Sequence, residues 1–445
     1  MINEKIFKAY DIRGTYPDQL NEEIAQRIAS AYAKKISPKT VVVGRDLREA
    51  SEKMFDRVVK ALIDQGVNVK DAGQMTNPMM GFAVFNYKYD GGIILSASHN
   101  PIGYGGIKMF RENAVTIPGN DSEIKKLTIE EDLDEKENKG TVEKIDIYDE
   151  YVHFVRNTVD LSKLKNKKIL FDACHGSVGL VLDKLLEGLP VERVDIRTNP
   201  DKTFAGLSEP NPLNPEINKA ALELAKKEGC DFGVMWDGDG DRAFFIDEQG
   251  CFVNAPYITA LLVEAVSKKH PNRAIASDVR VRWPIELACQ RSGMLYEESA
   301  SGYRFIKEKM VEKNAVFGAE MTAHYFFTET QNMDNGLIPF LMIWELLSTT
   351  GKSLSELIAP YKENHAMMDE IKLEVEDPGP IIARLKDEYK EFKINELDGL
   401  TVESDQFRFN LRASNTEPVA KLNMEAKSPE ILEKEKEKLI KLIKE

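Results

Sequence analysis

The chain has 445 residues, of which 42 % are hydrophobic and 30 % are charged, and its formal net charge at pH 7 is −14. These values fit a globular protein with about three domains of roughly 150 residues each. An acidic chain does not attract nucleic acid or anionic lipid, so we expect neither as a partner.

The 4 cysteines are scattered and form no C-x-x-C pair, which argues against a zinc knuckle or a redox dithiol and fits a reducing cytosol. Residues 1–7 lack the apolar core of a signal peptide. The most apolar stretch, residues 337–347, contains Pro339 and Glu345 and is too short to span a bilayer, so we predict a buried helix there. We expect a cytoplasmic protein without membrane contact, as a monomer or a homodimer.

Apolar strands alternate with helices through the first three quarters of the chain. Residues 41–43 predict a strand, residues 54–63 a helix, and residues 93–95 a second buried strand that leads into a polar segment, 96–101. This order is typical of a parallel α/β sheet.

The same unit recurs twice. A second unit begins at residues 168–172 and includes a strand, 232–236, that leads into an acidic segment, 237–242. A third begins at residues 274–278 and includes residues 316–322. Ligands of parallel sheets bind beyond the carboxyl ends of the strands, and the polar segments lie at these ends.

The last part of the chain has a different pattern. Residues 371–375 and 406–411 alternate like half-exposed strands, and Ser428 with Pro429 predicts the start of a C-terminal helix. We predict an α/β protein with three similar α/β domains, which have mixed, mainly parallel sheets, and a C-terminal α+β domain around a central cleft. The predicted domains are residues 1–144, 145–251, 252–366 and 367–445.

Three aspartates, Asp237, Asp239 and Asp241, stand at alternate positions after a buried strand. The glycines between them allow the backbone to curl, so that all three carboxylates can turn inward. Carboxylates this close repel one another unless a cation neutralises them, and hard oxygen ligands suit Mg²⁺ or Ca²⁺. An EF-hand loop is disfavoured, because Arg242 stands where that loop needs glycine. A solvated acidic loop is the plainer alternative.

Ser98 follows an apolar strand, and a hydroxyl at a strand end can carry a phosphoryl group covalently. A turn serine is the alternative reading. His99 is the next residue, so in an extended chain it points away from Ser98 and is a poor direct base. Lys108 follows a glycine-rich segment and could move protons or hold a phosphate, although a surface lysine is the simpler reading.

Two further segments carry chemistry suited to a phosphosugar. Arg412, Ser414, Asn415 and Thr416 offer a guanidinium fork, two hydroxyls and an amide, which suits a phosphate dianion, with a capped turn as the alternative. Residues 320–324 place Glu320, Thr322 and His324 at alternate positions after a strand. Alternation puts these side chains on one side, which suits hydrogen bonding to vicinal hydroxyls, although His324 could also be a core residue or a metal ligand.

The segments 10–14, 96–101, 237–242, 318–324 and 412–418 occur in this order. Together they resemble the α-D-phosphohexomutase superfamily, most closely its phosphomannomutase/phosphoglucomutase branch, over residues 8–418. The resemblance implies an Mg²⁺-dependent phosphohexomutase, an isomerase that interconverts hexose 6-phosphate and hexose 1-phosphate through a phosphoserine and a 1,6-bisphosphate intermediate. It favours mannose phosphate as the substrate, and a 1,6-bisphosphate would also be the activator.

The resemblance also implies a role for each site residue. Ser98 would be the phosphoserine and, with Asp237, Asp239 and Asp241, would bind Mg²⁺. The other candidate catalytic residues are Lys108 as general acid/base, Tyr10, Arg13, His99 and Arg242. The candidate substrate-binding residues are Glu320, Thr322, His324, Arg280, Tyr303, Arg412, Ser414, Asn415 and Thr416.

Several residues depart from the family pattern. Thr322 replaces a usual serine, Ala319 a common glycine, Tyr303 a frequent histidine and Arg280 a frequent lysine. These changes affect the choice of sugar rather than the chemistry. Phosphoglucomutase or dual specificity is therefore an alternative, and phosphoglucosamine mutase a weaker one. Two other classes compete: a phosphatase with an aspartate nucleophile, and a sugar-phosphate binder without catalysis.

Overall fold

The computed structural model describes residues 2–130, 135–375, 377–413 and 419–444. The chain forms two compact units, the first made of Met1–Phe252 and Glu329–Ser353 and the second of Val253–Thr328 and Leu354–Glu445. Within the described residues, no helix has both the length and the apolar character needed to cross a bilayer.

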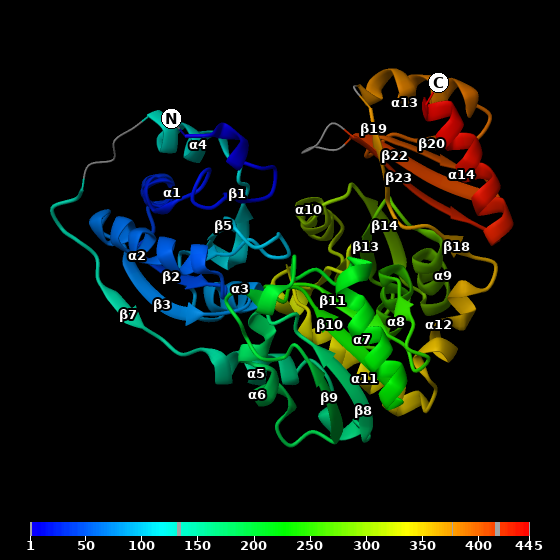
Figure 1. Cartoon of the computed structure of the whole chain (residues 1–445), viewed down its shortest axis with the longest axis horizontal. Coiled ribbons are helices and arrows are strands. Elements are labelled where there is room, and N and C mark those ends of the chain that lie inside the picture. Colours follow the sequence, from blue (N-terminus) through cyan, green and yellow to red (C-terminus); the bar gives the residue numbers. More distant parts are fainter. Residues whose placement is uncertain (1, 131–134, 376, 414–418, 445) are drawn as a thin grey trace. The chain divides into compact units, whose positions relative to one another are not determined.

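The first unit begins with a mixed sheet in the order β1-β5-β4-β2-β3-β7, with β6 paired to β5 (Figure 1). Its strands are β1 (Ile12–Thr15), β2 (Thr40–Arg45), β3 (Asn68–Gln74), β4 (Gly91–Leu95), β5 (Tyr104–Arg111), β6 (Val115–Ile117) and β7 (Val142–Lys144). Strand β2 pairs in parallel with β3 and β4, and β3 with β7. Strand β5 runs antiparallel to β1, β4 and β6.

Helices cover both faces of this sheet. They are α1 (Glu22–Ile36), α2 (Glu49–Asp64), α3 (Asn77–Asn86) and α4 (Ser122–Glu130). Val41 and Val43 of β2 belong to the core beneath α1 and α2. Val42 points to the other face, where Gly92 of β4 leaves room for Val84 of α3. Because successive side chains of a strand point to opposite faces, the continuous apolar run in β2 follows from burial on both sides.

A second sheet completes the first unit, in the order β12-β11-β10-β8-β9. Its strands are β8 (Lys167–Asp172), β9 (Val191–Ile196), β10 (Phe232–Trp236), β11 (Ala243–Ile246) and β12 (Phe252–Val253), and its helices are α5 (Tyr148–Arg156), α6 (Leu182–Leu186), α7 (Pro215–Glu228) and α11 (Leu337–Thr350), which β17 (Met333–Asp334) precedes. Strand β8 is parallel to β9 and β10, and β11 is antiparallel to β10.

The buried helix expected at residues 337–347 is confirmed as α11. Every residue from Leu337 to Leu347 except Glu345 is buried. Phe340 packs edge-on against the rings of Phe171 in β8 and Trp236 in β10. A helix that is apolar on all sides is stable in water only when it is enclosed, as α11 is here.

The second unit holds a sheet in which β13 (Ala274–Asp278) lies between β14 (Leu295–Ser299) and β15 (Phe317–Ala319), and β15 pairs with β16 (Tyr325–Phe327). The first two pairings are parallel and the third is antiparallel. The helices of this part are α8 (Ala255–Ser267), α9 (Trp283–Ser292), α10 (Tyr303–Lys313) and α12 (Leu354–Lys362).

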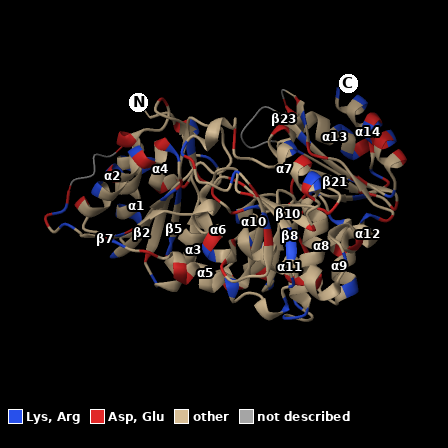
Figure 2. Ribbon diagram, turned by 60° about the horizontal axis from the view of Figure 1, so that its bottom comes forward, with Lys and Arg blue, Asp and Glu red and all other residues tan. Residues whose placement is uncertain are grey.

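The C-terminal part of the second unit is an antiparallel sheet in the order β18-β23-β22-β21-β20, with β19 paired to β23. Its strands are β18 (Ala366–Met367), β19 (Ile371–Glu374), β20 (Lys393–Asn395), β21 (Leu400–Glu403), β22 (Phe407–Ala413) and β23 (Val419–Ala426), and its helices are α13 (Pro378–Glu388) and α14 (Pro429–Lys444). Leu422 and Met424 face a core shared with both helices. Acidic and basic residues alternate along the outer side of α14 (Figure 2).

The polar face of this sheet meets the α/β part of the same unit. The buried Glu425 of β23 accepts hydrogen bonds from the backbone N–H groups of Arg282 and Trp283, at 2.9 and 3.1 Å, where α9 begins. His365 Nε2 lies 3.0 Å from the same carboxylate, and Arg408 Nη1 lies 3.3 Å from it. A carboxylate at a helix N-terminus is favoured by the helix dipole.

The predicted fold class is confirmed in its α/β domains with mixed sheets and its C-terminal α+β domain. The domain boundaries and the central cleft remain predictions.

Candidate active site

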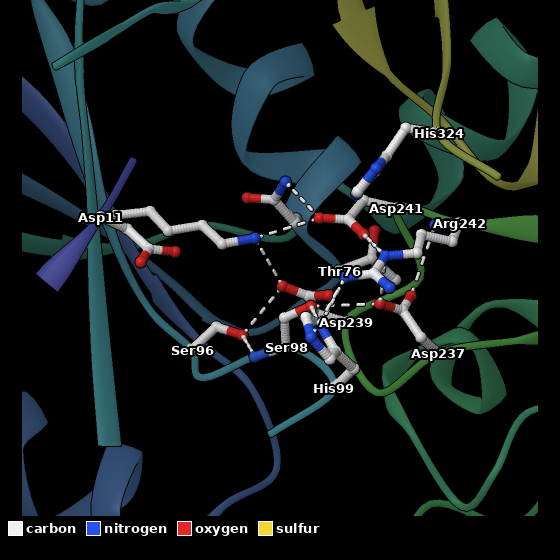
Figure 3. A network of polar contacts seen from close by, with 12 residues as sticks. Asp11, Thr76, Ser96, Ser98, His99, Asp237, Asp239, Asp241, Arg242 and His324 are labelled. Carbon is white, nitrogen blue, oxygen red and sulfur yellow. Dashed lines mark hydrogen bonds and ion pairs between the residues drawn. The ribbon is translucent and has the colours of Figure 1, made fainter. Parts of the chain in front are cut away.

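Ser98 lies in a sharp bend directly after β4. Its side chain is buried, at 2 % exposure, and its φ of 51° is in the left-handed region that non-glycine residues rarely adopt. Ser98 Oγ donates a hydrogen bond to Asp237 Oδ2 at 3.1 Å, and Ser98 N donates to Ser96 Oγ at 3.0 Å (Figure 3). The bend thus directs the hydroxyl of the first sheet toward the acidic loop of the second.

Arg48 stabilises the bend through its backbone carbonyl groups. Its guanidinium donates to the backbone carbonyl oxygens of Ser98, Asn100 and Pro101 at 2.8, 2.6 and 2.8 Å. Asp46 accepts from Ala97 N at 3.3 Å and lies 3.4 Å from Arg48 Nε. A strained backbone persists only where its surroundings over-determine it, and these contacts supply that restraint.

The acidic loop follows β10 and carries Asp237, Asp239 and Asp241. All three are buried, and one carboxylate oxygen of each lies within 4.8 Å of the others. Gly238 allows this close approach, because a Cβ there would lie 2.6 Å from the Ser98 carbonyl oxygen. Gly240 has φ +73°, a conformation that glycine adopts without strain.

Lys108 of β5 reaches the same carboxylates. Strand β5 returns beside β4 with Lys108 opposite Ile94, and Lys108 Nζ lies 2.8 Å from Asp239 Oδ2 and 3.0 Å from Asp241 Oδ2. Burial lowers the pKa of Lys108, but the two aspartates outweigh it and raise the pKa well above its usual value. Ser96 Oγ and Asn77 Nδ2 donate to the same oxygens of Asp239 and Asp241, at 3.0 and 3.1 Å.

The acidic loop fits a divalent cation. Asp239 Oδ1 is buried and has no hydrogen-bond partner among the described residues. Lys108 and Arg242 contact the loop. Oxygen donors around a buried negative charge are the ligand set that Mg²⁺ prefers.

Arg13 of β1 also stabilises the bend at Ser98. It pairs with both oxygens of Asp11, at 2.9 and 2.7 Å, donates to the Ala97 carbonyl oxygen at 3.1 Å, and also contacts Asn100. Burial lowers the pKa of Arg13, but Asp11 outweighs it and raises the pKa above its usual value. Tyr10 is half-buried in the bend before β1.

His99 does not point away from Ser98. The expectation from an extended chain is wrong here, because the positive φ of Ser98 turns the backbone. His99 Nδ1 lies 3.2 Å from Ser98 Oγ and 2.5 Å from Arg242 Nη2. Arg242 in turn lies beside Asp237, with 3.5 Å between Nε and Oδ2.

In the second unit, Glu320, Thr322 and His324 form a second cluster. Glu320 Oε2 accepts from Thr322 Oγ1 at 3.2 Å and lies 2.7 Å from His324 Nδ1. The predicted cause, alternation along a strand, is wrong. Strand β15 ends at Ala319, and a tight turn closed by Glu320 N to His324 O, at 3.0 Å, brings the side chains together.

Asp278, at the end of β13, connects this turn to Arg280. Arg280 donates to both oxygens of Asp278, at 2.9 and 2.7 Å, and Met321 N donates to Asp278 Oδ2 at 2.9 Å. Arg280 Nη2 lies 3.8 Å from Glu320 Oε1. Burial lowers the pKa of Arg280, and Asp278 raises it above its usual value. Tyr303, also predicted, begins α10, where Lys307 lies over its ring.

Arg412 is buried near the end of β22, where it pairs with Glu370. The other three predicted residues of its loop, Ser414, Asn415 and Thr416, lie outside the described residues. In the first unit, the predicted residues that lie around Ser98 are Arg13, His99, Lys108, Asp237, Asp239, Asp241 and Arg242. In the second unit, Arg280, Glu320, Thr322 and His324 lie together, and Arg412 pairs with Glu370.

Several residues of these clusters were not predicted. They are Asp46, Arg48, Asn77, Ser96, Asp278 and Glu370. Asp46, Ser96 and Asp278 stand at the carboxyl ends of strands, the same signal that identified Ser98 and Asp237, so they could have been found. No pattern in the sequence pairs Arg48 with backbone carbonyls 50 residues away.

The chain matches the four domains described for phosphoglucomutase/phosphomannomutase. These are α/β/α domain I at residues 4–135, α/β/α domain II at 149–250, α/β/α domain III at 254–363 and the C-terminal domain at 370–442. Together the four matches cover most of the chain in a single order.

Whole-chain relatives agree with the domain matches. The chain is 37 % identical to a phosphomannomutase of Salmonella typhimurium over 432 residues, which are 95 % of this chain and 94 % of the relative. It is 36 % identical to a protein of Xanthomonas campestris named phosphohexose mutases, over 95 % of both chains. A crystal structure of a phosphoglucomutase/phosphomannomutase family protein from Burkholderia thailandensis has a TM-score of 0.90 at 26 % identity, over 100 % of this chain and 98 % of that one. The chain therefore belongs to the phosphoglucomutase/phosphomannomutase family.

Proposed function

We propose that the protein is a phosphohexomutase that interconverts hexose 6-phosphate and hexose 1-phosphate, with mannose phosphate as the preferred substrate. The observation that carries this proposal is the contact of Ser98 Oγ with Asp237, at 3.1 Å, beside a loop of three buried carboxylates. A hydroxyl beside a cation site suits a phosphoryl carrier, because phosphoryl transfer depends mainly on positioning and on neutralisation of charge.

Ser98 carries the phosphoryl group in this proposal. The strained bend presents Oγ outward from the end of β4, and Arg48 and Arg13 fix the backbone on either side. Because the nucleophile is already held in place, little free energy is lost in orienting it when the phosphoryl group arrives or leaves. Asp237, Asp239, Asp241 and phosphorylated Ser98 would hold Mg²⁺, which, when bound, neutralises the charge that develops on the transferring group.

Lys108 is the proposed general acid and base. Its side-chain nitrogen contacts Asp239 and Asp241, and Ser96 donates a hydrogen bond to the same oxygen of Asp239. Lys108 acts as the base in its neutral amine form, after its ammonium group has released a proton to solvent. As the hydroxyl of the sugar attacks phosphorus, its proton passes to this amine, the new P–O bond forms to the sugar and the bond from phosphorus to Ser98 Oγ breaks. The product of this half-reaction is a hexose 1,6-bisphosphate.

The second half-reaction runs in the opposite direction with the other phosphate. The bisphosphate turns around, and the phosphoryl group at its other end passes to Ser98 Oγ, while Lys108 returns the proton to the departing sugar oxygen. The serine is then phosphorylated again and the net result is isomerisation. A hexose 1,6-bisphosphate also serves as the activator, because it phosphorylates any Ser98 that has lost its phosphate.

The proposal assigns recognition of the sugar to the second unit. Glu320 and Thr322 accept and donate hydrogen bonds to the hydroxyls of the hexose, and His324 orients Glu320 through its contact at 2.7 Å. Arg280 and Arg412, with Ser414, Asn415 and Thr416, bind the phosphate that does not react, and Tyr303 contributes to the same region. Met321 between Glu320 and Thr322 favours mannose or glucose phosphate over glucosamine phosphate, by analogy only.

The test is a comparison of kcat/KM for mannose, glucose and glucosamine 1-phosphates, with Mg²⁺ and the matching 1,6-bisphosphate present. We expect mannose 1-phosphate first and glucose 1-phosphate close behind. A preference for the amino sugar would overturn the choice of substrate but not the class of reaction. Release of inorganic phosphate at a rate equal to substrate loss would instead indicate a phosphatase, and unchanged turnover in Ser98→Ala would indicate the same.

A further inference from the structure

Three basic residues form a row across the C-terminal sheet. Lys372 of β19 is the register partner of Lys421 in β23, and Lys421 is the register partner of Arg412 in β22. Like charges directly opposite each other on neighbouring strands destabilise a sheet. An anion is therefore needed where Arg412 and Lys421 meet.

Glu370 supplies that anion. It directly precedes β19, and its two carboxylate oxygens are shared between the two cations, with Oε2 at 2.5 Å from Arg412 Nη2 and Oε1 at 3.2 Å from Lys421 Nζ. Burial raises the pKa of Glu370, but Arg412, Arg280 and Lys421 outweigh it and lower the pKa, so Glu370 is ionised at neutral pH.

The charges and donors of this cluster are those of a phosphate site. Arg412 and Lys421 share the single carboxylate of Glu370, and a phosphate dianion in its place would carry one more negative charge. Arg412 Nε is buried and has no hydrogen-bond partner among the described residues, and the Asp398 carboxylate is 3.8 Å from it, beyond hydrogen-bond distance. A third oxygen, which phosphate has and a carboxylate lacks, could accept from this donor.

We propose that Glu370 is an internal counter-ion that occupies the phosphate position of Arg412 and Lys421, and that a bound phosphate displaces it. The inference rests on the proposed function, which assigns Arg412 to the phosphate that does not react, and it adds Lys421 as a phosphate-binding residue. Glu370 keeps 22 % of its side chain exposed, so its carboxylate has access to water when it leaves.

Displacement of Glu370 has a consequence for turnover. The bisphosphate must release its bound phosphate before it can turn around, and release from two bare cations would be slow because of their attraction for the dianion. When Glu370 returns to Arg412 and Lys421, its carboxylate compensates their positive charges. This lowers the free-energy cost of releasing the phosphate. Glu370 thus lowers the affinity for the phosphate and raises the rate of its release.

The direct test is titration of the full-length protein with inorganic phosphate by isothermal calorimetry at low ionic strength. We expect Glu370→Gln to bind phosphate about tenfold more tightly, since a repulsive charge a few ångströms from the ligand is removed. Lys421→Met should bind more weakly. Glu374→Gln is the matched control, because it removes the same charge from an exposed position of the same segment, and its affinity should stay within about twofold of wild type.

A second variant covers the case in which the amide disturbs the fold. Glu370→Asp keeps the charge but withdraws it by one methylene, and we expect an affinity between those of wild type and Glu370→Gln, with an unchanged melting temperature. Equal or weaker phosphate binding in both Glu370 variants would overturn the inference. In kinetics, Glu370→Gln should lower KM for hexose 1-phosphate and also lower kcat, because release becomes slower.

Failure of the counter-ion role of Glu370 and failure of the proposed mutase activity give different results. The phosphate titration requires no turnover, so a wild-type protein without mutase activity would overturn the proposed function and leave the titration informative. A wild-type mutase whose Glu370→Gln variant has unchanged phosphate affinity would overturn only the counter-ion inference.

Discussion

Ser98 Oγ lies 3.1 Å from Asp237 Oδ2, although 139 positions separate the two residues in the chain. The contact joins the carboxyl end of β4 in one sheet to the carboxyl end of β10 in the next, within a single compact unit. Ser98 and the acidic loop belong to different sheets, so they meet only if both sheets are folded.

Replacement of the serine should remove the reaction. We expect Ser98→Ala to lower kcat of the mutase by at least about a thousandfold with little change in melting temperature, because it removes only the oxygen that we propose as the phosphoryl carrier. The coupled assay for hexose 6-phosphate measures it. Ser51→Ala is the control, since Ser51 is also buried but lies in α2, and this variant should keep wild-type activity.

A methyl group at Gly238 should separate the two loops. The added Cβ would lie 2.6 Å from the Ser98 carbonyl oxygen, so one backbone must move. We expect Gly238→Ala to lose most activity and about 1–3 kcal/mol of unfolding free energy, measured by urea denaturation. Gly379→Ala is the control, because among the described residues the three atoms nearest to its added methyl group belong to the Asp377 side chain, the first at 3.2 Å, and we expect wild-type values. Normal activity and stability in Gly238→Ala would contradict the close approach of the two loops.

Mg²⁺ should stabilise the folded protein through the acidic loop. At about 100 times its dissociation constant, the ion should add about 2.7 kcal/mol to the free energy of unfolding. Asp239→Asn should remove most of this increment, because it neutralises one buried ligand of the three. Thermal melts with increasing Mg²⁺ measure it. Asp195→Asn, on the surface of β9, should keep the full increment, and an equal shift in both variants would mean that the ion binds elsewhere.

Glu425 should make stability depend on pH on the acid side. Burial raises the pKa of Glu425, but His365 and Arg408 outweigh it and lower the pKa below its usual value. A lowered folded-state pKa gives stability that is fully present above the unfolded-state pKa and is lost as the pH falls through the folded-state pKa. Glu425→Gln should therefore cost about 3 kcal/mol at pH 7 and progressively less below about pH 4.5.

The measurement is the free energy of unfolding of both proteins from pH 3 to pH 7. Glu374→Gln, which is exposed, controls for the loss of one negative charge. A deficit in Glu425→Gln that is independent of pH would show that the ionised carboxylate contributes nothing at the start of α9.

Asp278 should act on substrate binding through Arg280. Asp278→Asn keeps an acceptor for Met321 N but directs an amide toward the guanidinium, so the turn at Glu320 keeps its hydrogen bond while Arg280 loses its ionic partner. We expect KM for hexose 1-phosphate to rise about tenfold with a smaller change in kcat. A variant with lower kcat and unchanged KM would contradict this positioning role.

Much of the fold was predictable, because burial determines which positions of a strand or helix carry apolar residues. The continuous apolar runs of β2, β4 and β10 and the uniformly apolar α11 are each explained by enclosure on both faces. Ser98 and Asp237 were predictable for a related reason, since polar side chains that directly follow such runs lie at the edge of the sheet where ligands bind.

The geometry within the site was less predictable. His99 contacts Ser98 only because Ser98 adopts a left-handed conformation, which Arg48 enforces from 50 residues away. Glu320 and His324 meet through a turn rather than through strand alternation. Long-range contacts such as these depend on the packed tertiary structure and leave no local pattern in the sequence.

The most direct test of the central claim is to locate the phosphoryl group. The purified protein would be incubated with Mg²⁺ and a hexose 1,6-bisphosphate, digested and mapped by tandem mass spectrometry, with Ser98→Ala treated in parallel. We predict one phosphate per chain on Ser98 in wild type and none in the variant. Phosphate on another residue, or on an aspartate of the acidic loop, would contradict the account.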